Sequence, residues 1–408
     1  MQSQQKIFQR IENLKTEMTD ALIQLTRIPA VGPENGGEGE FRKAEALAEF
    51  LEKSGFDMIE RYDAVDQRVP SGKRPNIVAY LKGETAQPLW IVTHLDVVPS
   101  GEEALWKVTK PFEPVVREDR VFGRGTEDNG QSLVASLFAV RALTSLGITP
   151  KFTVALAFVS DEEMGSKMGI LHLLNQGVFR KGALVVVPDS GSRDGSFIEI
   201  TEKSILWFKL TTLGKQTHGS LPNKGLNAHR IGMETALEID AFLHRKYSAR
   251  NVYFDMPTST FEPTRKDRNV DAVNMIPGED VVYFDCRVLP DYQLDSVLAD
   301  VNAVIAEQDR KSGAEVRLDV LQRQDAPALE NEHVKIVGSL RKALKEARGI
   351  DARVGGIGGG TCAAFFRKAG IPAVVWSTID EVAHQPDEYS RVENMVADAK
   401  VFALLMVS

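Results

Sequence analysis

The sequence predicts an α/β protein with two parts: a larger, discontinuous domain whose sheet is covered by helices, and an inserted ferredoxin-like α+β domain. The chain has 408 residues, more than the roughly 250–300 at which one hydrophobic core stops growing. Short, unbroken apolar strands alternate with helical patterns, which is typical of a sheet covered on both faces. One segment instead has the order β-α-β-β-α-β, the order of the ferredoxin-like unit.

The first part of the larger domain is predicted to span residues 1–203. Two amphipathic patterns near its start predict helices, and Gly55 is a suitable C-cap for the second. A third helix is closed by Gly147, and four short apolar runs predict buried strands. The expected helices are 5–27, 40–53 and 132–146, and the expected strands are 76–81, 89–93, 152–159 and 183–187.

The pattern changes after Lys203, and the inserted domain is predicted to span residues 204–322, a plausible length for a small domain. After Pro327 the first pattern resumes, so residues 323–408 are expected to complete the larger domain. The inserted domain should contain strands at 205–213, 252–261, 280–288 and 315–321 and helices at 227–243 and 294–311. The last part should contain helices at 333–347 and 362–369, a Gly-rich run at 355–360 and a strand at 373–377.

The composition limits the classes of function. Hydrophobic residues make up 43% and charged residues 26%, as in soluble globular proteins, and no window reaches the ~18 apolar residues of a membrane span. A net charge of −8 without a long basic run argues against nucleic-acid binding. Two cysteines fit a reducing compartment, and the charges among the first twenty residues exclude a signal peptide, so we expect a cytoplasmic protein.

The first motif that can carry chemistry is Thr93-His94-Leu95-Asp96, at the carboxyl end of a predicted strand, where α/β folds place ligands. Residues two apart on an extended chain point the same way. Asp96 can therefore accept one imidazole N–H while the other ring nitrogen of His94 binds a metal. A strand-end histidine satisfied by a neighbouring carboxylate is the simpler alternative.

The second motif is the run 123–131, which opens the third predicted helix. Glycines before a helix can bind phosphate at its N-terminus. This run, however, lacks the Lys-Ser/Thr ending of a phosphate loop and carries Glu127 and Asp128 instead. These carboxylates would repel a phosphate and attract a cation. The alternative is an aspartate that caps the helix.

Three further motifs lie after predicted strands. The adjacent carboxylates of Asp161, Glu162 and Glu163 repel one another unless a positive group lies among them. Such neighbours can also divide two tasks, one binding a metal and the other acting as general base. Asp189 lies in a Pro-Asp-Ser-Gly turn, and His384 lies in a later loop. Taken singly, these motifs are explained by a solvated acidic loop, an ordinary turn and a loop histidine.

Taken together, the motifs place two histidines and three carboxylates after predicted strands or a glycine turn. This nitrogen and oxygen set suits Zn²⁺, with Co²⁺ or Mn²⁺ as substitutes. With one carboxylate bridging, the set would serve two metals ~3.5–4 Å apart. The five residues are His94, Asp128, Glu163, Asp189 and His384.

With these motifs in this order, the sequence resembles the M20 metallopeptidases and deacylases. That family includes acetylornithine deacetylase, succinyl-diaminopimelate desuccinylase, carboxypeptidase G2, aminoacylase and the PepV-type dipeptidases. The resemblance covers nearly the whole chain. The matching stretches are His94-Leu95-Asp96, 123–128, 161–165, Asp189, His218 within 214–220, Asn274-Met275-Ile276-Pro277 and 384–388.

The resemblance implies how the metals are held. One metal would be bound by His94 and Asp189, and the other by Glu163 and His384. Asp128 would bridge the two. The expected cofactor is therefore a pair of divalent ions, with Zn²⁺ preferred.

The resemblance also implies the catalytic groups. Asp96 would orient His94, and Glu162 would be the general base. The inserted domain would act as a lid and as the dimerisation surface of a homodimer. His218 lies on this lid, and in the family such a histidine reaches an active site, often that of the partner subunit, to stabilise the oxyanion.

Substrate contacts follow from the same resemblance. Arg287 matches an arginine that binds a substrate carboxylate. Asn274 and the run Gly359-Gly360-Thr361 match positions that contact the substrate.

Three positions depart from the family pattern. Gly130 stands where the family commonly has the lysine of Asp-x-Lys-Gly, and Cys362 stands where an aspartate commonly follows Gly-Gly-Thr. Asp189 stands where the deacetylases and desuccinylases usually have glutamate. Aspartate is commoner there in the dipeptidases and aminopeptidases of the family, which favours a peptide-like substrate.

The remaining thiol and histidines are not expected to react. Cys362 is expected to be a buried, inert thiol. The other histidines lie in or beside predicted helices, away from acidic clusters, and are expected to be structural or at the surface. They are His172, His229, His244 and His333.

The sequence therefore predicts a di-metal hydrolase that cleaves the amide or peptide bond of a small carboxylate-bearing substrate, a dipeptide or an N-acyl amino acid. Metal-activated water would attack, with Glu162 as general base, and neither nucleic acid nor membrane is an expected partner. One alternative is a biosynthetic deacylase for succinyl-diaminopimelate or acetylornithine. Another is a catalytically silent, metal-stabilised binding protein, against which the presence of Glu162 argues.

Overall fold

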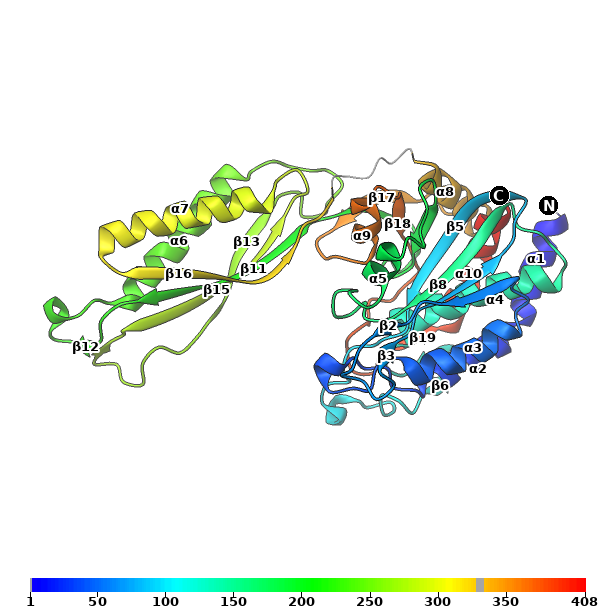
Figure 1. Ribbon diagram of the computed structural model, residues 1–408, viewed down its shortest axis with the longest axis horizontal. Coiled ribbons are helices and arrows are strands. Elements are labelled where there is room, and N and C mark those ends of the chain that lie inside the picture. Colours follow the sequence, from blue (N-terminus) through cyan, green and yellow to red (C-terminus); the bar gives the residue numbers. More distant parts are fainter. Residues whose placement is uncertain (1, 328–333) are drawn as a thin grey trace. The chain divides into compact units, whose positions relative to one another are not determined.

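The structure is a computed structural model that describes residues 2–327 and 334–408 (Figure 1). The described residues form two compact units. The first consists of residues 2–200, 334–354 and 361–408, and the second of residues 201–327 and 355–360. The Gly-rich run thus belongs to the second unit. None of the helices in the described ranges combines the length and the apolar character needed to cross a membrane.

The first unit is built on an eight-stranded mixed sheet with the order β1-β4-β8-β5-β9-β18-β10-β17. The central strands β8, β5, β9 and β18 are parallel to their neighbours within that group, whereas β1, β4 and β10 pair antiparallel. The predicted α/β class is confirmed. The strands are β1 (Met58–Arg61), β4 (Ile77–Leu81), β5 (Thr85–His94), β8 (Phe152–Val159), β9 (Leu184–Val187), β10 (Phe197–Glu202), β17 (Arg353–Ile357) and β18 (Ala373–Val375).

Helices cover both faces of this sheet, because its central strands are apolar on both sides. On one face, Trp90 and Val92 of β5 pack with Leu173 of α5 and Phe366 of α9. The residues that alternate with them point to the other face, where α4 packs on β5 and α10 packs on α4. The helices are α1 (Gln2–Asn13), α2 (Lys15–Thr26), α3 (Phe41–Glu52), α4 (Ser132–Ser145), α5 (Ile170–Asn175), α8 (Lys335–Arg348), α9 (Ala363–Lys368) and α10 (Val392–Val407).

Short strands complete the first unit. A three-stranded sheet has the order β19-β7-β6, and β2 pairs with β3. In the three-stranded sheet, Tyr389 pairs with Phe122. This pairing joins the segment just after His384 to the segment just before Asp128. The strands are β2 (Ala64–Val65), β3 (Lys73–Arg74), β6 (Val115–Arg117), β7 (Arg120–Phe122) and β19 (Tyr389–Arg391).

The second unit is a four-stranded antiparallel sheet with the order β13-β15-β11-β16. Helices α6 and α7 lie along one face of it (Figure 1) and enclose a core that includes Phe208, Phe284 and Val301. This confirms the predicted ferredoxin-like arrangement. The elements are β11 (Ser204–Leu213), α6 (Ala228–Lys246), β13 (Thr260–Lys266), β15 (Glu279–Val288), α7 (Leu294–Ser312), β16 (Glu315–Gln324) and the short pair β12 (Thr217–His218) and β14 (Met275–Ile276).

The structure differs from the element predictions in several places, and β1, α5 and β10 are among the elements that were not expected. The helix expected at 5–27 is two helices, which meet at Leu14. The strand expected at 252–261 begins only at Thr260, because Lys203 Nζ donates to the carbonyl oxygens of Met256 and Thr258 and holds that stretch as a loop. Helix α10 was not expected, since its residues are too uniformly apolar to show an amphipathic period.

Candidate metal centre

Three of the five predicted ligands arise at the carboxyl ends of neighbouring strands. Strand β5 lies between β8 and β9 and runs parallel to both. His94 is the last residue of β5, while Glu163 follows β8 and Asp189 follows β9. Parallel strands end at the same edge of a sheet, so their three side chains meet there.

Asp128 joins the two histidines, with one carboxylate oxygen directed to each. The Nε2 atom of His94 lies 2.8 Å from Asp128 Oδ1 and 3.2 Å from Asp189 Oδ1. The Nε2 atom of His384 lies 3.0 Å from Asp128 Oδ2 and 3.2 Å from Glu163 Oε1. The structure therefore brings all five predicted ligands together, from segments that are far apart in the sequence.

Two overlapping groups of ligand atoms fit a metal ion. In each group the atoms lie within 4.8 Å of one another, and the groups are His94 with Asp128 and Glu163, and His94 with Glu162 and Asp189. Imidazole nitrogens with carboxylate oxygens are a donor set suited to Zn²⁺ and similar ions. Because Glu162 belongs to the second group, distance alone fits this residue either as a ligand or as a base.

The charges at the site favour a cation. Burial acts to lower the pKa of His94, but hydrogen bonds to Asp128 and Asp189 outweigh it and hold that pKa well above its usual value. Hydrogen bonds to Asp128 and Glu163 raise the pKa of His384 to about 10. Both imidazoles thus gain protons because carboxylates surround them, and a metal ion could supply the same positive charge in place of those protons.

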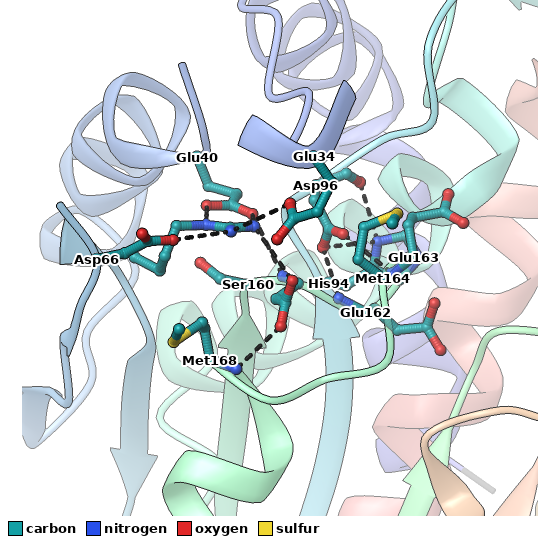
Figure 2. Close-up of polar contacts among 12 residues, drawn as sticks. Glu34, Glu40, Asp66, His94, Asp96, Ser160, Glu162, Glu163, Met164 and Met168 are labelled. Carbon is teal, nitrogen blue, oxygen red and sulfur yellow. Dashed lines mark hydrogen bonds and ion pairs between the residues drawn. The ribbon is translucent and has the colours of Figure 1, made fainter. Parts of the chain in front are cut away.

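The pKa of the Glu162 carboxyl group is strongly shifted. Burial of its carboxyl group, reinforced by the negative charge of Asp189, raises the pKa of Glu162 well above its usual range. A carboxyl group with a raised pKa takes up a proton more readily than an ordinary one. Figure 2 shows Glu162 and Glu163 on the same turn, beside His94 and Asp96.

Asp96 contacts His94 through its main-chain oxygen, whereas the sequence led us to expect a contact through its carboxylate. The Nδ1 atom of His94 is hydrogen bonded to the main-chain oxygen of Asp96 at 3.0 Å, and the carboxylate lies farther away, at 3.6 Å. The carboxylate instead accepts the backbone N–H groups of Glu162 at 3.1 Å and Glu163 at 3.0 Å. One residue therefore positions both the histidine and the acidic turn.

A buried ion cluster, for which the motifs gave no indication, lies behind the acidic turn. Arg74 and Glu40 are fully buried and paired through two hydrogen bonds, one of them 2.6 Å from Arg74 Nε to Glu40 Oε2. Glu40 also accepts the backbone N–H of Asp161 at 3.2 Å. Asp161 has φ +66°, a left-handed conformation that is unfavourable outside glycine. The cluster (Figure 2) thus holds the first residue of the turn that presents Glu162.

Asn129 is a second residue that the motifs did not single out. Its Nδ2 atom donates to the carbonyl oxygen of Pro188 at 2.7 Å and to Asp189 Oδ1 at 3.1 Å. It follows Asp128 directly and therefore ties two of the predicted ligands together. A lone asparagine in a turn carries no sequence signal for such a role.

The predicted oxyanion group lies on the second unit. His218 ends β12 and is exposed, and its Nδ1 atom lies 2.8 Å from Ser220 Oγ. The main-chain oxygen of Asn274 accepts the N–H of Gly219 at 2.7 Å. His218 and Asn274, both expected at the active site, are therefore neighbours within the lid.

Arg287, the predicted carboxylate-binding residue, lies on β15 of the second unit. Its guanidinium group makes a bidentate pair with Asp285, at 2.7 and 3.0 Å. Its Nη1 atom donates to the main-chain oxygen of Gly358 at 3.0 Å. The side chain is therefore held in one orientation and attached to the Gly-rich run.

The other predicted substrate contacts continue that run. Gly359 and Gly360 belong to the second unit, and Thr361 begins the return to the first. Thr361 Oγ1 accepts the N–H of Ala363 at 3.2 Å, at the start of α9.

Of the side chains expected to be inert, Cys362 is buried. His229 Nδ1 lies 3.0 Å from Asp280 Oδ1 in the second unit, a carboxylate that the sequence pattern did not indicate. His244 is exposed and bonded to the main-chain oxygen of Asp240. His333 lies outside the described residues.

The sheet edge that gathers the predicted histidine and carboxylate ligands is a candidate metal site. Residues 90–408 match peptidase family M20/M25/M40, and the chain belongs to this family of hydrolases acting on amide bonds. An uncharacterised metallohydrolase of Methanocaldococcus jannaschii is 39% identical over 396 residues, which cover 93% of this chain and 96% of that protein. Succinyl-diaminopimelate desuccinylase of Alkalilimnicola ehrlichii is 26% identical, over 88% of this chain and 91% of that protein.

Solved structures share the fold over almost the whole chain. The dipeptidase Dug1p of Saccharomyces cerevisiae aligns with a TM-score of 0.75 and 19% identity, over 99% of this chain and 98% of that one. The YXEP protein of Bacillus subtilis, described as a dinuclear metal binding peptidase, aligns with a TM-score of 0.64 and 18% identity, over 97% and 98%. Both share the fold of a peptidase with catalytic and lid domains.

Proposed function

We propose that the chain is a di-metal hydrolase of a small, carboxylate-bearing amide, a dipeptide or an N-acyl amino acid. The observation that carries this proposal is the carboxylate of Asp128, which directs one oxygen to each of two histidines. Each histidine also has a carboxylate of its own, Asp189 for His94 and Glu163 for His384. These five side chains would hold two divalent ions, with Zn²⁺ preferred and Co²⁺ or Mn²⁺ as substitutes.

When bound, the two ions would polarise the scissile carbonyl and lower the pKa of a water molecule. Glu162 takes the proton of the attacking water, and the water oxygen bonds to the carbonyl carbon. His218 stabilises the negative charge that forms on the carbonyl oxygen. As the C–N bond breaks, Glu162 gives its proton to the leaving nitrogen.

Recognition of the substrate is assigned to the second unit and to Thr361, where the chain returns to the first unit. Arg287 offers a planar guanidinium group that suits a substrate carboxylate. The substrate would also contact Asn274, Gly359, Gly360 and Thr361. We further propose a cytoplasmic homodimer that pairs through the lid.

Two substrate classes have separate support. The aspartate at position 189 and the dipeptidase fold of Dug1p favour a peptide-like substrate. The desuccinylase relative favours the alternative of a biosynthetic deacylase. Glu162 argues against a silent binding protein, because a structural metal site needs no base.

The test is a panel of dipeptides, N-acetyl and N-succinyl amino acids, succinyl-diaminopimelate among them, with each activity measured before and after a chelator. We expect hydrolysis of at least one substrate, its loss with the chelator and its return with Zn²⁺ or Co²⁺. Matched amides without a carboxylate are the control and should be poor substrates. Binding of metal without hydrolysis of any member would support the silent binding protein instead.

A further inference from the structure

Two buried glutamates connect the segment that carries Asp128 to the loop that carries His384. Glu127 precedes Asp128 and is 4% exposed, and Glu388 lies four residues after His384 and is fully buried. Each carboxylate lies against the backbone of the other segment. We call this pair of glutamates the carboxylate clasp.

The first half of the clasp is Glu127. Its Oε1 atom accepts the N–H of Asp380 at 2.6 Å. Its Oε2 atom accepts the N–H groups of Val382 at 2.6 Å and Ala383 at 2.9 Å. Three of the four backbone N–H groups at 380–383, just before His384, are thus satisfied by one side chain.

The second half of the clasp is Glu388. Its Oε1 atom accepts the N–H groups of Gly125 at 3.0 Å, Glu127 at 3.0 Å and Asp128 at 3.2 Å. Its Oε2 atom is paired with Arg124 Nη1 at 2.6 Å. The backbone on both sides of the clasp is therefore held by a carboxylate from the opposite segment.

The loop that carries His384 needs such support. Three of its non-glycine residues have left-handed backbone angles, with φ +62° at Glu381, +63° at His384 and +57° at Asp387. Strained conformations persist only where surrounding contacts fix them. The His384 side chain is 52% exposed, so little packing holds the ring itself. The position of this ligand is set through its backbone.

We propose that Glu127 is a positioning residue, whose carboxylate holds the backbone of His384 at the place where His384 and Asp128 can share one cation. The inference rests on the proposed dinuclear centre. In this proposal Glu127 contacts neither substrate nor metal. Removing its carboxylate should weaken binding only of the metal held by His384 and Glu163. The other metal, on His94 and Asp189, should be held as before.

The test titrates the chelator-treated protein with Co²⁺ alone and follows the visible spectrum to obtain two dissociation constants. In Glu127→Gln an NH₂ group replaces one carboxylate oxygen and therefore faces backbone N–H donors without accepting from them. The constant for the site that contains His384 is identified as the one that His384→Ala raises. We expect Glu127→Gln to raise the same dissociation constant about 10- to 100-fold, the usual cost of losing a group that orients a ligand. The second constant should not change.

A double variant separates positioning from general damage. In the His384→Ala background, Glu127→Gln should weaken Co²⁺ binding no further, since its effect passes through the missing imidazole. The matched control is Glu199→Gln, which removes a buried carboxylate paired with Arg367 at 2.8 Å. It should lower the melting temperature and leave both constants unchanged. Equal losses of both metals, no loss, or a further loss in the double variant would each overturn the proposal.

Hydrogen exchange of the chelator-treated protein keeps this inference separate from the proposed function. Glu127→Gln should speed amide exchange in residues 380–383, whereas Glu199→Gln should leave that segment protected. If the wild-type protein binds fewer than two Co²⁺ ions, the dinuclear centre fails. In that case an unchanged exchange rate in Glu127→Gln overturns the clasp as well, and a faster rate supports its hold on the loop.

Discussion

Glu162 and Glu163 are neighbours in the chain, yet their carboxylates have different partners. Glu163 Oε1 lies 3.2 Å from His384 Nε2, and in the proposed centre these two residues would hold the same metal. Glu162 lies in the group with His94 and Asp189. Asp96 fixes the backbone of both glutamates, so the division of their tasks depends on where each side chain points from a shared turn.

Replacing each glutamate by glutamine should separate the two tasks. We expect Glu162→Gln to keep both metals and to lose about 10²–10⁴ in turnover, the usual contribution of a general base. Glu163→Gln should lose one metal, because an amide is a poor substitute for a carboxylate ligand. Metal content by plasma emission, measured beside activity, distinguishes them. Equal metal loss in both variants would show that Glu162 is a ligand.

At the scale of elements, α10 is joined to the sheet by a buried carboxylate. Asp398 of α10 accepts the N–H of Thr378 at 3.0 Å and its hydroxyl at 2.6 Å, just beyond the end of β18. Gln131 Nε2, at the start of α4, lies 3.3 Å from the same carboxylate. The contact therefore links α10, the sheet and the helix that follows Asp128.

This contact predicts a pH dependence of stability. Burial raises the pKa of Asp398 from its usual 3.8 to about 6. The folded protein therefore holds this proton more tightly than the unfolded chain, so the free energy of unfolding falls as pH rises between about 4 and 6. The loss is up to about 3 kcal/mol at ~1.4 kcal/mol per pKa unit.

Urea unfolding at several pH values, compared with Asp398→Asn, measures this contribution. The wild-type protein should lose stability relative to the variant as pH rises through that window. Parallel profiles for the two proteins would contradict the assignment. The comparison with the variant removes the contribution of all other titrating groups that the two proteins share.

At the scale of the whole molecule, the proposed reaction draws on both units. The five proposed metal ligands and Glu162 belong to the first unit, and His218 and Arg287 belong to the second. The two compact units offer different chemical groups. The first gathers carboxylates, and the second presents the exposed His218 and the guanidinium group of Arg287, which is paired with Asp285. Losing one oxyanion donor typically costs about 10²–10³ in turnover, so a lid histidine can matter almost as much as a ligand.

A mixing experiment tests the lid and the dimer together. His218→Ala alone should lower turnover by about 10²–10³, and Glu162→Gln alone should be nearly inactive. If His218 serves the active site of the partner subunit, a mixture of the two variants should recover part of the wild-type activity. An intact turnover in His218→Ala would show that the histidine is misassigned, and a dimer without recovery in the mixture would place it in its own subunit's site.

The sequence by itself determined the α/β class, the ferredoxin-like insertion and the five side chains that converge at the sheet edge. It could do so because apolar strands are local patterns, and a polar residue directly after a parallel strand has one edge to occupy. His94, Glu163 and Asp189 follow this rule.

Only the tertiary structure decided which groups hold these side chains. It showed that Asp96 bonds His94 through its main-chain oxygen, that Arg74 and Glu40 support Asp161, and that Glu127 and Glu388 join two distant segments. These contacts pair a side chain with a backbone N–H, a backbone carbonyl oxygen or a charge remote in the sequence. Every residue except proline has a backbone N–H and every residue has a carbonyl oxygen, so no residue type marks the partner, and only the folded chain brings the two together.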